Sequence, residues 1–543
     1  MRAFAQLYRA LDATRSSRQK TDLMASYFSQ ADASSAAWAV YFLAGARLRR
    51  LVSSRALRDY AATQIELPQW LFEASYQSVG DLAETITLLL PESAATRDER
   101  LCDWVEHSLL PLRAQPVDQR AQGLSQALAG WSSDTRFVCL KLLTGGFRVG
   151  VSRLLVTRAL AQALNLPATL MAQRLVGYLS ADHLPTAQRW HALANAERDA
   201  LISPGQPYPL FLAHALKSDG TDFAGELGSV SDWQFEYKYD GIRAQLVCRQ
   251  AQGWLWSRGE ELLDSQFPEL LDLAQGLPQG LVLDGEILVW DDVRQAPAPF
   301  AALQQRLGRK RVSAAMLRTH GAIFMAYDLL EYAAQDCRHW PLSKRRAQLE
   351  QLVSAAKLAG LRLSPTLHPS DWAQARALQQ GAREHCAEGL MLKQQQSRYG
   401  IGRTRQAGVW LKFKLEPFSI DAVLLYAQKG HGRRANLYTD YTFALWQDTS
   451  HEPALVPIAK AYSGLTDEEI REVDSIVKKT ILESFGPVRQ VKPTLVFEVG
   501  FEGLFQSTRH KSGVALRFPR ILRWRRDKSI DQANTLAELK ALL

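Results

Sequence analysis

The sequence has little cysteine and no apolar segment long enough to cross a membrane. Its 543 residues include five cysteines, which are widely spaced and form no Cys-x-x-Cys pair. This scarcity excludes a disulfide framework and a cysteine-based zinc site, and it favours reduced thiols. No run of 18 apolar residues occurs, and residues 1–17 lack the apolar core of a signal peptide. We therefore expect a cytoplasmic protein without a membrane partner.

An acidic excess is lacking as well. Lysine and arginine number 65 against 56 aspartates and glutamates, which leaves a net charge of +9 at pH 7. The composition, 47% hydrophobic and 22% charged, is that of a folded globular protein, and the length predicts roughly two to four domains. A positive surplus favours an acidic partner such as nucleic acid, although a basic surface that only maintains solubility would give the same balance.

Strand-like alternation is nearly absent from the N-terminal third of the chain. Segments 81–90 and 153–165 carry apolar residues at helical spacing, and a proline- and glycine-rich stretch at 203–209 interrupts this pattern. Beyond about residue 217, short alternating segments separated by Asp-Gly and glycine-rich turns are typical of α+β structure. After Pro417 a further set of short strands begins. These changes predict three domains, at 1–205, 206–415 and 416–543.

The most informative segment is 233–249. Its first half alternates aromatic and polar residues, so Glu236 and Lys238 share one face of the expected strand. The dipeptide at 240–241, Asp-Gly, predicts a tight hairpin whose second strand brings Arg243 back beside Lys238. A lysine on an exposed strand face is often only solvated, so the meaning of this one depends on whether companion motifs follow.

Residues 238–243 (KYDGIR) resemble motif I of the covalent nucleotidyltransferases, which are the DNA ligases, RNA ligases and mRNA capping enzymes. The resemblance implies that Lys238 is the nucleophile that accepts a nucleoside monophosphate, with Glu236 and Arg243 contacting the nucleotide. Only a neutral amine attacks, and an unperturbed lysine is almost fully protonated at pH 7. Nearby cations and partial desolvation would favour the neutral form.

Further motifs of the same superfamily have counterparts in the expected order. They are SRGE at 257–260 (motif Ia), LDGEIL at 283–288 (III), FMAYDLL at 324–330 (IIIa), EGLMLK at 388–393 (IV), WLKFK at 410–414 (V) and RDK at 526–528 (VI). The resemblance implies ATP contacts for Arg258, Glu286, Tyr327, Arg405, Lys412 and Lys414, metal ligation by Glu286 and Glu388, and pyrophosphate contacts for Arg526 and Lys528.

Elementary chemistry supports several of these roles and leaves alternatives to others. Lys412 and Lys414 share one strand face and would repel each other unless they faced an anion such as a phosphate. Tyr327 could stack on a purine or could be an ordinary core aromatic. Asp284 could face solvent from an edge strand. Glu388 and Lys393 are five residues apart, so a regular strand would not place them on one face. Glu388 is therefore expected just before its strand begins.

The basic segment 509–528 holds eight lysines and arginines against one acid. It could orient pyrophosphate, as motif VI does, or form a DNA-contacting surface.

The N-terminal helical region resembles the DNA-binding domain of ATP-dependent DNA ligases. Its best local match is 141–160, which contains a Gly-Gly-Phe-Arg-Val-Gly turn between helices. Glycines permit close approach to a phosphate backbone, and Arg148 and Arg153 would help to neutralise it. The alternative is a tight helix-to-helix corner without DNA contact. The four-cysteine zinc site of NAD-dependent ligases is not visible.

The sequence is identified as a member of the ATP-dependent DNA ligase family and looks closest to the accessory bacterial ligases sometimes called ligase B. The resemblance implies an all-α N-terminal domain, an α+β nucleotidyltransferase (adenylation) domain and a C-terminal β-barrel OB-fold domain. It implies ATP, Mg²⁺ with Mn²⁺ as a substitute, nicked duplex DNA, a monomer associated with the nucleoid in a bacterium, and unidentified repair partners. The alternatives are an RNA ligase or capping-type guanylyltransferase, and a non-catalytic DNA clamp.

Overall fold

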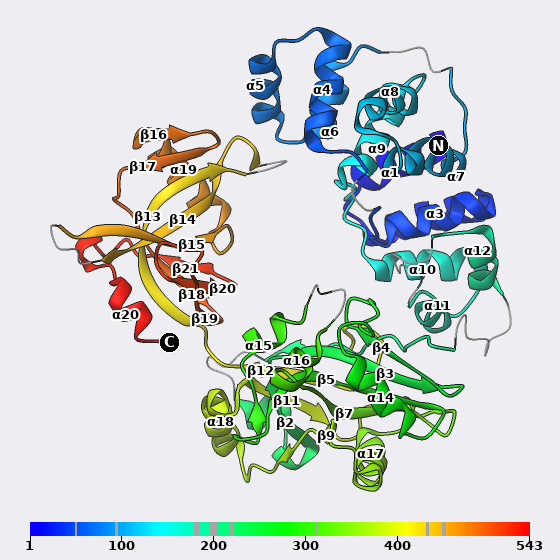
Figure 1. Ribbon diagram of the computed structural model, residues 1–543, viewed down its shortest axis with the longest axis vertical. Helices are drawn as coiled ribbons and strands as arrows, with labels where there is room; N and C mark the ends of the chain where they lie inside the picture. The colour runs from blue at the N-terminus through cyan, green and yellow to red at the C-terminus, as the bar shows by residue number, and fades with distance from the viewer. Residues whose placement is uncertain are drawn as a thin grey trace. The chain divides into compact units, whose positions relative to one another are not determined.

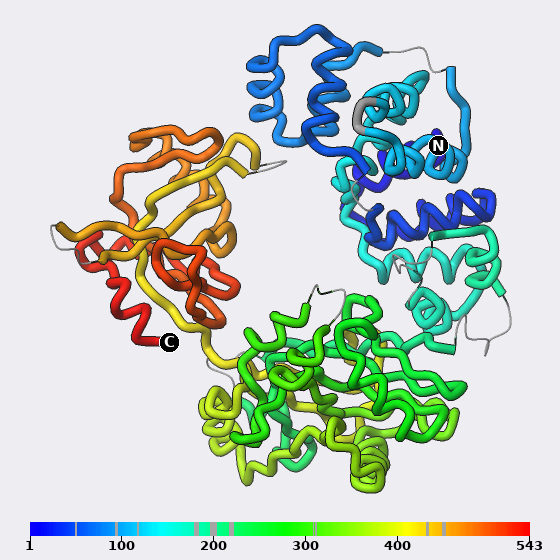
Figure 2. Tube along the Cα trace, in the orientation of Figure 1, coloured from blue at the N-terminus to red at the C-terminus, as the bar shows by residue number. Residues whose placement is uncertain are grey.

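The computed structural model describes the chain except residues 49–50, 93–95, 177, 179–183, 196–203, 217–221, 308, 310–311, 431–433 and 448–451 (Figure 1, Figure 2). The described residues group into two compact units, and the helical region contributes to both. The first unit is Met1–Arg49, Glu99–Val105 and Phe147–Leu415, and the second is Arg50–Asp98, Glu106–Gly146 and Glu416–Leu543. The domain boundaries at 205 and 415 stay predictions.

The N-terminal region is helical, as predicted. Its helices are α1 (Arg2–Ala13), α2 (Ser17–Gln30), α3 (Ala33–Leu43), α4 (Ser54–Ile65), α5 (Gln69–Val79), α6 (Leu82–Leu89), α7 (Leu101–Asp103), α8 (Val117–Leu128), α9 (Ser133–Thr144), α10 (Arg153–Leu164), α11 (Ala168–Arg174) and α12 (Ala187–Ala194). Helix α3 is apolar on all sides and is almost completely buried, which is the expected place for such a helix. Serine, threonine or aspartate side chains cap many of these helices, for example Ser152 at the start of α10.

The central region contains two sheets. The first has the order β1-β12-β11-β2-β10 and comprises β1 (His214–Ala215), β2 (Trp233–Tyr239), β10 (Thr366–Leu367), β11 (Ala387–Gln394) and β12 (Trp410–Lys414). The second has the order β4-β3-β5-β7-β8, with β6 on β5 and β9 on β7. It comprises β3 (Ile242–Arg249), β4 (Gln252–Ser257), β5 (Leu281–Asp291), β6 (Ala296–Pro297), β7 (Ala322–Tyr332), β8 (Gln335–Asp336) and β9 (Leu361–Leu363).

The hairpin predicted at 240–241 is wrong. Strand β2 pairs with β10 and β11, whereas β3 pairs with β4 and β5, so the Asp-Gly turn carries the chain from one sheet to the other. Gly241 is needed there because its backbone passes close to β5, and not because of hairpin geometry. A Cβ atom on it would lie 2.5 Å from the carbonyl oxygen of Ile287 on β5.

Apolar layers hold the two sheets together and cover their outer faces. A cluster that includes Phe211, Val247, Leu330 and Trp410 contains residues of both sheets. Helices α14 (Pro268–Gln275) and α17 (Leu342–Ala356) pack on the second sheet, and α18 (Trp372–Gln380) packs on the first. The two sheets therefore face each other, and core residues of both border the space between them.

The C-terminal region is sheet-rich, as predicted. It comprises β13 (Phe418–Lys429), β14 (Tyr438–Gln447), β15 (Ala454–Ala461), α19 (Asp467–Lys479), β16 (Ile481–Phe485), β17 (Val488–Val491), β18 (Val496–Phe501), β19 (Gly503–Gln506), β20 (Val514–Arg517), β21 (Arg520–Trp524) and α20 (Leu536–Lys540). The long strand β13 pairs with β14, β17 and β18, and α19 buries Val473 and Val477 in the same core. None of the five cysteines, all of which lie among the described residues, forms a disulfide, and four are buried.

Among the described residues, no single helix is long and apolar enough to cross a membrane. The pair α10 and α11, bent by 117° at their junction, would reach that length and composition only jointly.

Candidate active site

A cavity of about 170 Å³ lies between the two central sheets and collects half of the predicted site residues. Every strand that borders it contributes a polar side chain. Among the residues that line the cavity are Glu236 and Lys238 from β2, Arg243 from β3, Arg258 after β4, Glu286 from β5, Tyr327 from β7 and Lys412 from β12.

Lys238 is paired with an acid on the neighbouring strand. Its Nζ donates to Oε2 of Glu388 at 2.6 Å, and Nζ of Lys414 lies 3.3 Å from the same oxygen. The prediction that Glu388 precedes its strand is wrong, because β11 already begins at Ala387. A bulge between Ala387 and Leu390 breaks the regular alternation of β11, and this brings Glu388 to the side of Lys238.

Gly389 makes this bulge possible. Its φ of +133° is unfavourable for residues with a side chain, and a Cβ atom there would lie 2.1 Å from the carbonyl oxygen of Phe413. The glycine of motif IV is thus required by the backbone geometry that positions Glu388.

Positive charges gather around Lys412. Burial lowers the pKa of Lys412, and so do the neighbouring charges of Arg403, Lys414, Lys238 and Arg258. Burial raises the pKa of Glu388, but Lys238 and Lys414 outweigh it, and the net shift is downward. A cluster of cations of this kind is a suitable environment for an anion of high charge density, such as a polyphosphate.

The pKa of Glu286 shifts in the opposite direction to that of Glu388. Burial raises its pKa to about 8, although the charges of Lys238 and Arg243 act against this rise. Without an additional cation, the Glu286 carboxyl is therefore largely protonated at neutral pH. A bound metal ion would favour its charged form.

Arg243 is fixed by a buried network centred on Asp284. Nε and Nη2 of Arg243 donate to the two Asp284 oxygens at 3.1 and 2.7 Å. The hydroxyls of Tyr327 and Tyr399 donate to the same carboxylate at 3.2 and 2.5 Å. The alternative that Asp284 faces solvent from an edge strand is wrong, because β5 lies between β3 and β7 and this side chain is 0% exposed.

Glu236 lines the cavity but is already saturated with hydrogen bonds. It accepts from Lys393 at 2.8 Å, from Gln234 at 2.5 Å and from Ser364 at 2.9 Å. The Lys393 ammonium lies 4.3 Å from the centre of the Tyr327 ring. No role was predicted for Lys393, although its place on the strand that carries motif IV is a signal that could have identified it.

The structure brings Arg403, rather than the predicted Arg405, to the cavity. Both arginines lie in the connection between β11 and β12 and both are exposed, but Arg403 lines the cavity and Arg405 does not. The position of an arginine in this long loop cannot be counted from the flanking motifs, because the loop follows no regular period.

The two motif VI residues lie in the second compact unit and are ion-paired there. Arg526 binds both oxygens of Glu472 on α19, at 2.8 and 2.6 Å, with its guanidinium 3.9 Å from the centre of the Trp524 ring. Lys528 donates to Asp421 on β13 at 2.6 Å. Of the two arginines predicted to contact DNA, Arg148 is exposed in the turn before α10, whereas Arg153 is paired with Glu260.

The donor set next to Lys238 fits a magnesium ion. Glu286 and Glu388 offer hard carboxylate oxygens, and among the described residues no cluster of three or more metal-binding side chains occurs. Magnesium is commonly held by one or two carboxylates, with water and substrate phosphates completing its shell. Two carboxylates beside a polyphosphate site match that preference.

Three family models match consecutive parts of the chain. "DNA ligase N terminus" matches residues 1–161, "ATP dependent DNA ligase domain" matches 212–414, and "ATP dependent DNA ligase C terminal region" matches 434–528. The cavity and all its strand residues fall within the second match.

Similar curated proteins extend over nearly the whole chain. The chain is 32% identical to "Probable DNA ligase" of Koribacter versatilis (strain Ellin345), over 99% of this chain and 95% of that protein. It is 30% identical to "Probable DNA ligase" of Rhodococcus jostii (strain RHA1), over 98% of each. The solved structure titled "Pmar-Lig_PreS3" covers 96% of this chain with a TM-score of 0.60 and 15% identity, a likeness of fold alone.

Proposed function

The chain belongs to the ATP-dependent DNA ligases, enzymes that join DNA at the expense of ATP, and on that premise we propose that it seals nicks in duplex DNA through an AMP adduct on Lys238. The observation that carries this proposal is the position of Lys238, which lines the cavity within hydrogen-bonding distance of Glu388 and among the cations that surround Lys412.

In the first step Nζ of Lys238 attacks the α-phosphorus of ATP. A nitrogen–phosphorus bond forms, the bond from the α-phosphorus to the bridging oxygen breaks, and pyrophosphate leaves. The positive charges of Lys412, Lys414 and Arg403 stabilise the negative charge that develops on the phosphate. Tyr327 would stack on the adenine, and Arg526 and Lys528 would contact the leaving pyrophosphate.

In the second step a 5′-phosphate oxygen at the nick attacks the same phosphorus, and the bond to Lys238 breaks. In the third step the adjacent 3′-hydroxyl attacks the DNA 5′-phosphorus, and AMP leaves. A Mg²⁺ ion, or Mn²⁺ in its place, held by Glu286 and Glu388, would neutralise charge on the phosphates. We further propose a cytoplasmic monomer; its repair partners and its ligase B subtype stay predictions.

The test is incubation with α-labelled ATP and Mg²⁺, followed by unlabelled nicked duplex DNA. The proposal expects label on the wild-type protein, its transfer into sealed DNA, and no label on the Lys238→Ala variant. A labelled Lys238→Ala protein would exclude this nucleophile. Label from GTP instead of ATP, or discharge only by nicked RNA, would favour the capping-type or RNA ligase alternatives. If the folded protein accepts no label at all, the non-catalytic DNA clamp is the alternative that remains.

A further inference from the structure

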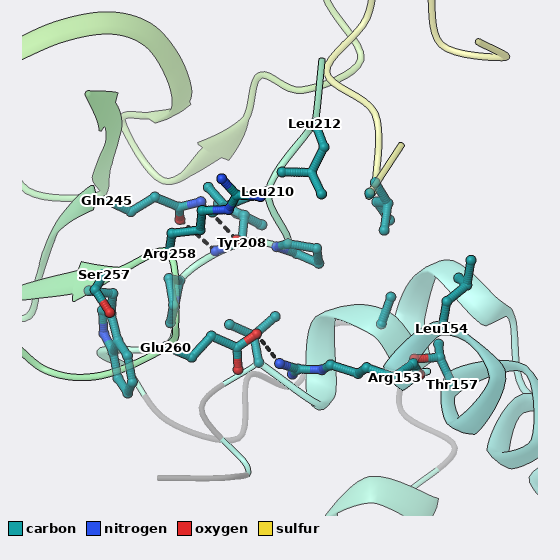
Figure 3. A pocket seen from close by; sticks show the side chains of 17 residues that line it. Arg153, Leu154, Thr157, Tyr208, Leu210, Leu212, Gln245, Ser257, Arg258 and Glu260 are labelled. Atoms are coloured by element: carbon teal, nitrogen blue, oxygen red, sulfur yellow. Dashed lines mark hydrogen bonds and ion pairs between the residues drawn. The ribbon is translucent and has the colours of Figure 1, made fainter. Parts of the chain in front are cut away.

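A second cavity, of about 350 Å³, lies where α10 and α11 meet the central region within the first compact unit (Figure 3). Its lining includes Leu154 from α10 and Tyr208 from the segment before β1. It shares two lining residues, Leu212 and Arg258, with the cavity that contains Lys238. The two cavities therefore adjoin at the turn that follows β4.

One ion pair joins opposite sides of this second cavity. Arg153, the first residue of α10, directs Nη1 to the carboxylate of Glu260 (Figure 3). Its Nη2 donates to the carbonyl oxygen of Leu175, just after α11. The Arg153 and Glu260 side chains are 30% and 20% exposed. A pair withdrawn this far from water is screened less than one on the open surface.

Glu260 belongs to the tight turn that also carries Arg258. The backbone N–H of Ser257 donates to the carbonyl of Glu261 at 2.9 Å, and that of Glu260 donates to the carbonyl of Ser257 at 2.9 Å. Glu260 has a left-handed φ of +61°, which few residues with a side chain adopt without support. A contact that fixes Glu260 therefore also restrains Arg258 in the same turn. The charge of Arg258 helps to lower the pKa of Lys412.

Other contacts keep the same helical segment in place. Nε2 of Gln206 donates to the carbonyl oxygens of Gln173 and Val176, at 2.6 and 3.1 Å. Nη2 of Arg338 donates to Oε1 of Gln173 at 3.3 Å. The end of α11 is therefore attached to the central region independently of Arg153, which gives the Arg153–Glu260 pair a defined geometry.

We propose that Arg153 and Glu260 form a latch that docks α10 on the turn 257–261 and so positions Arg258 for the nucleotide. The latch rests on the proposed function, because its effect is exerted on ATP binding. It makes Arg153 a positioning residue in the protein without DNA, instead of the DNA contact that its sequence motif implies. The helical region then contributes to self-adenylation before DNA binds.

The test measures self-adenylation without DNA over a range of ATP concentrations, using Arg153→Glu, Glu260→Arg and the double variant that exchanges the two charges. Each single variant is expected to raise the KM for ATP roughly threefold to tenfold and to change kcat less than about twofold. The double variant should recover part of the loss in KM, since the ion pair is restored with its charges exchanged while the hydrogen bond to the Leu175 carbonyl is not.

The matched control is Arg158→Glu, an exposed arginine on the same helix with the same change in charge. It should leave the KM for ATP unchanged. Circular dichroism melts check that each variant folds. If the charge-reversal variants do not fold, the single variants Arg153→Gln and Glu260→Gln replace them.

Two results would overturn the latch. In the first, Arg153→Glu leaves the KM for ATP unchanged but weakens binding to nicked duplex and flattens its salt dependence, as loss of a phosphate contact does. In the second, the effects of the single variants add in the double variant. Failure of the proposed function is separate, because then the wild-type protein itself would form no AMP adduct.

Discussion

Two lysine–glutamate pairs join strands β2 and β11, and they differ mainly in burial. Lys393 and Glu236 are 2.8 Å apart, and their side chains are 1% and 2% exposed. Lys238 and Glu388 are 2.6 Å apart, and their side chains are 24% and 19% exposed. Each strand supplies the acid to one pair and the lysine to the other, so the same backbone arrangement supports both.

The difference separates a pair that holds the site from a pair that can react. Glu236 accepts from Gln234 and Ser364 in addition to Lys393, so removal of Lys393 would leave an incompletely satisfied buried charge. Glu388 is shared by Lys238 and Lys414. Lys238 can therefore form a bond to phosphorus while the carboxylate keeps another partner. The same pairing chemistry thus serves different purposes, because one pair is almost fully buried and the other is partly exposed.

The largest expected effect concerns the accessible pair. Lys238→Arg retains the positive charge but has no accessible neutral form, so we expect it to lower self-adenylation by at least about 10³-fold. Its stability should remain within about 1 kcal/mol of the wild type, because a partly exposed pair contributes little. Labelling with ATP and urea unfolding measure the two quantities. Labelling of the variant at the wild-type rate would contradict the division between the pairs.

The buried pair should show the reverse pattern. Lys393→Met removes one partner of a buried pair, and we expect a loss of about 3–5 kcal/mol in the free energy of unfolding. The double variant Lys393→Met with Glu236→Gln should recover part of that loss, since no unpaired charge then remains. Urea unfolding gives both values. A loss below about 1 kcal/mol would mean that burial does not distinguish the pairs.

The bulge that orients Glu388 can be tested at Gly389. Gly389→Ala introduces a Cβ atom against the Phe413 carbonyl at a φ of +133°, so we expect destabilisation of more than about 1 kcal/mol. We also expect self-adenylation to fall roughly tenfold or more as Glu388 is displaced. Gly381→Ala is the matched control, because a Cβ atom there meets nothing within 4 Å and its φ is −77°. Equal effects of the two substitutions would argue against the bulge.

The pH dependence of stability concerns Glu286, the second acid beside Lys238. Its folded-state pKa of about 8 lies above the ordinary value of 4.5, so the folded state keeps a proton that the unfolded state loses between these pH values. Stability should therefore fall as the pH rises from about 4.5 to about 8 in the absence of divalent cations. Glu286→Gln should lack this component, and thermal melts at several pH values compare the two proteins. Parallel pH profiles would contradict the raised pKa.

Local chemistry made much of the site predictable from the sequence. Glu236, Lys238 and Arg243 lie within one short segment, and Lys412 alternates with apolar residues, so the strand period alone assigns their faces. Long-range pairing was not predictable in the same way. The Asp-Gly signal at 240–241 cannot distinguish a hairpin from a crossing between two sheets, because both need a tight turn.

Irregular backbone accounts for the other differences. The bulge at 387–390 breaks the strand period on which the placement of Glu388 depended. The loop 395–409 has no period, so Arg403 could not be chosen over Arg405. Arg153 looks like a DNA contact in its motif, and only the folded chain brings Glu260 to it across 107 residues of sequence.

The sequence by itself determined the chemical type of the protein: a reactive lysine, the order of its companion motifs, and helical, α+β and sheet-rich regions in succession. These properties follow from residue types and short periods, which act within a few residues of one another. Only the tertiary structure decided which lysine is accessible and which is buried, and which carboxylate each one meets. Burial and pairing depend on residues far apart in the chain, so the electrostatic environment of a side chain arises only when the sheets assemble.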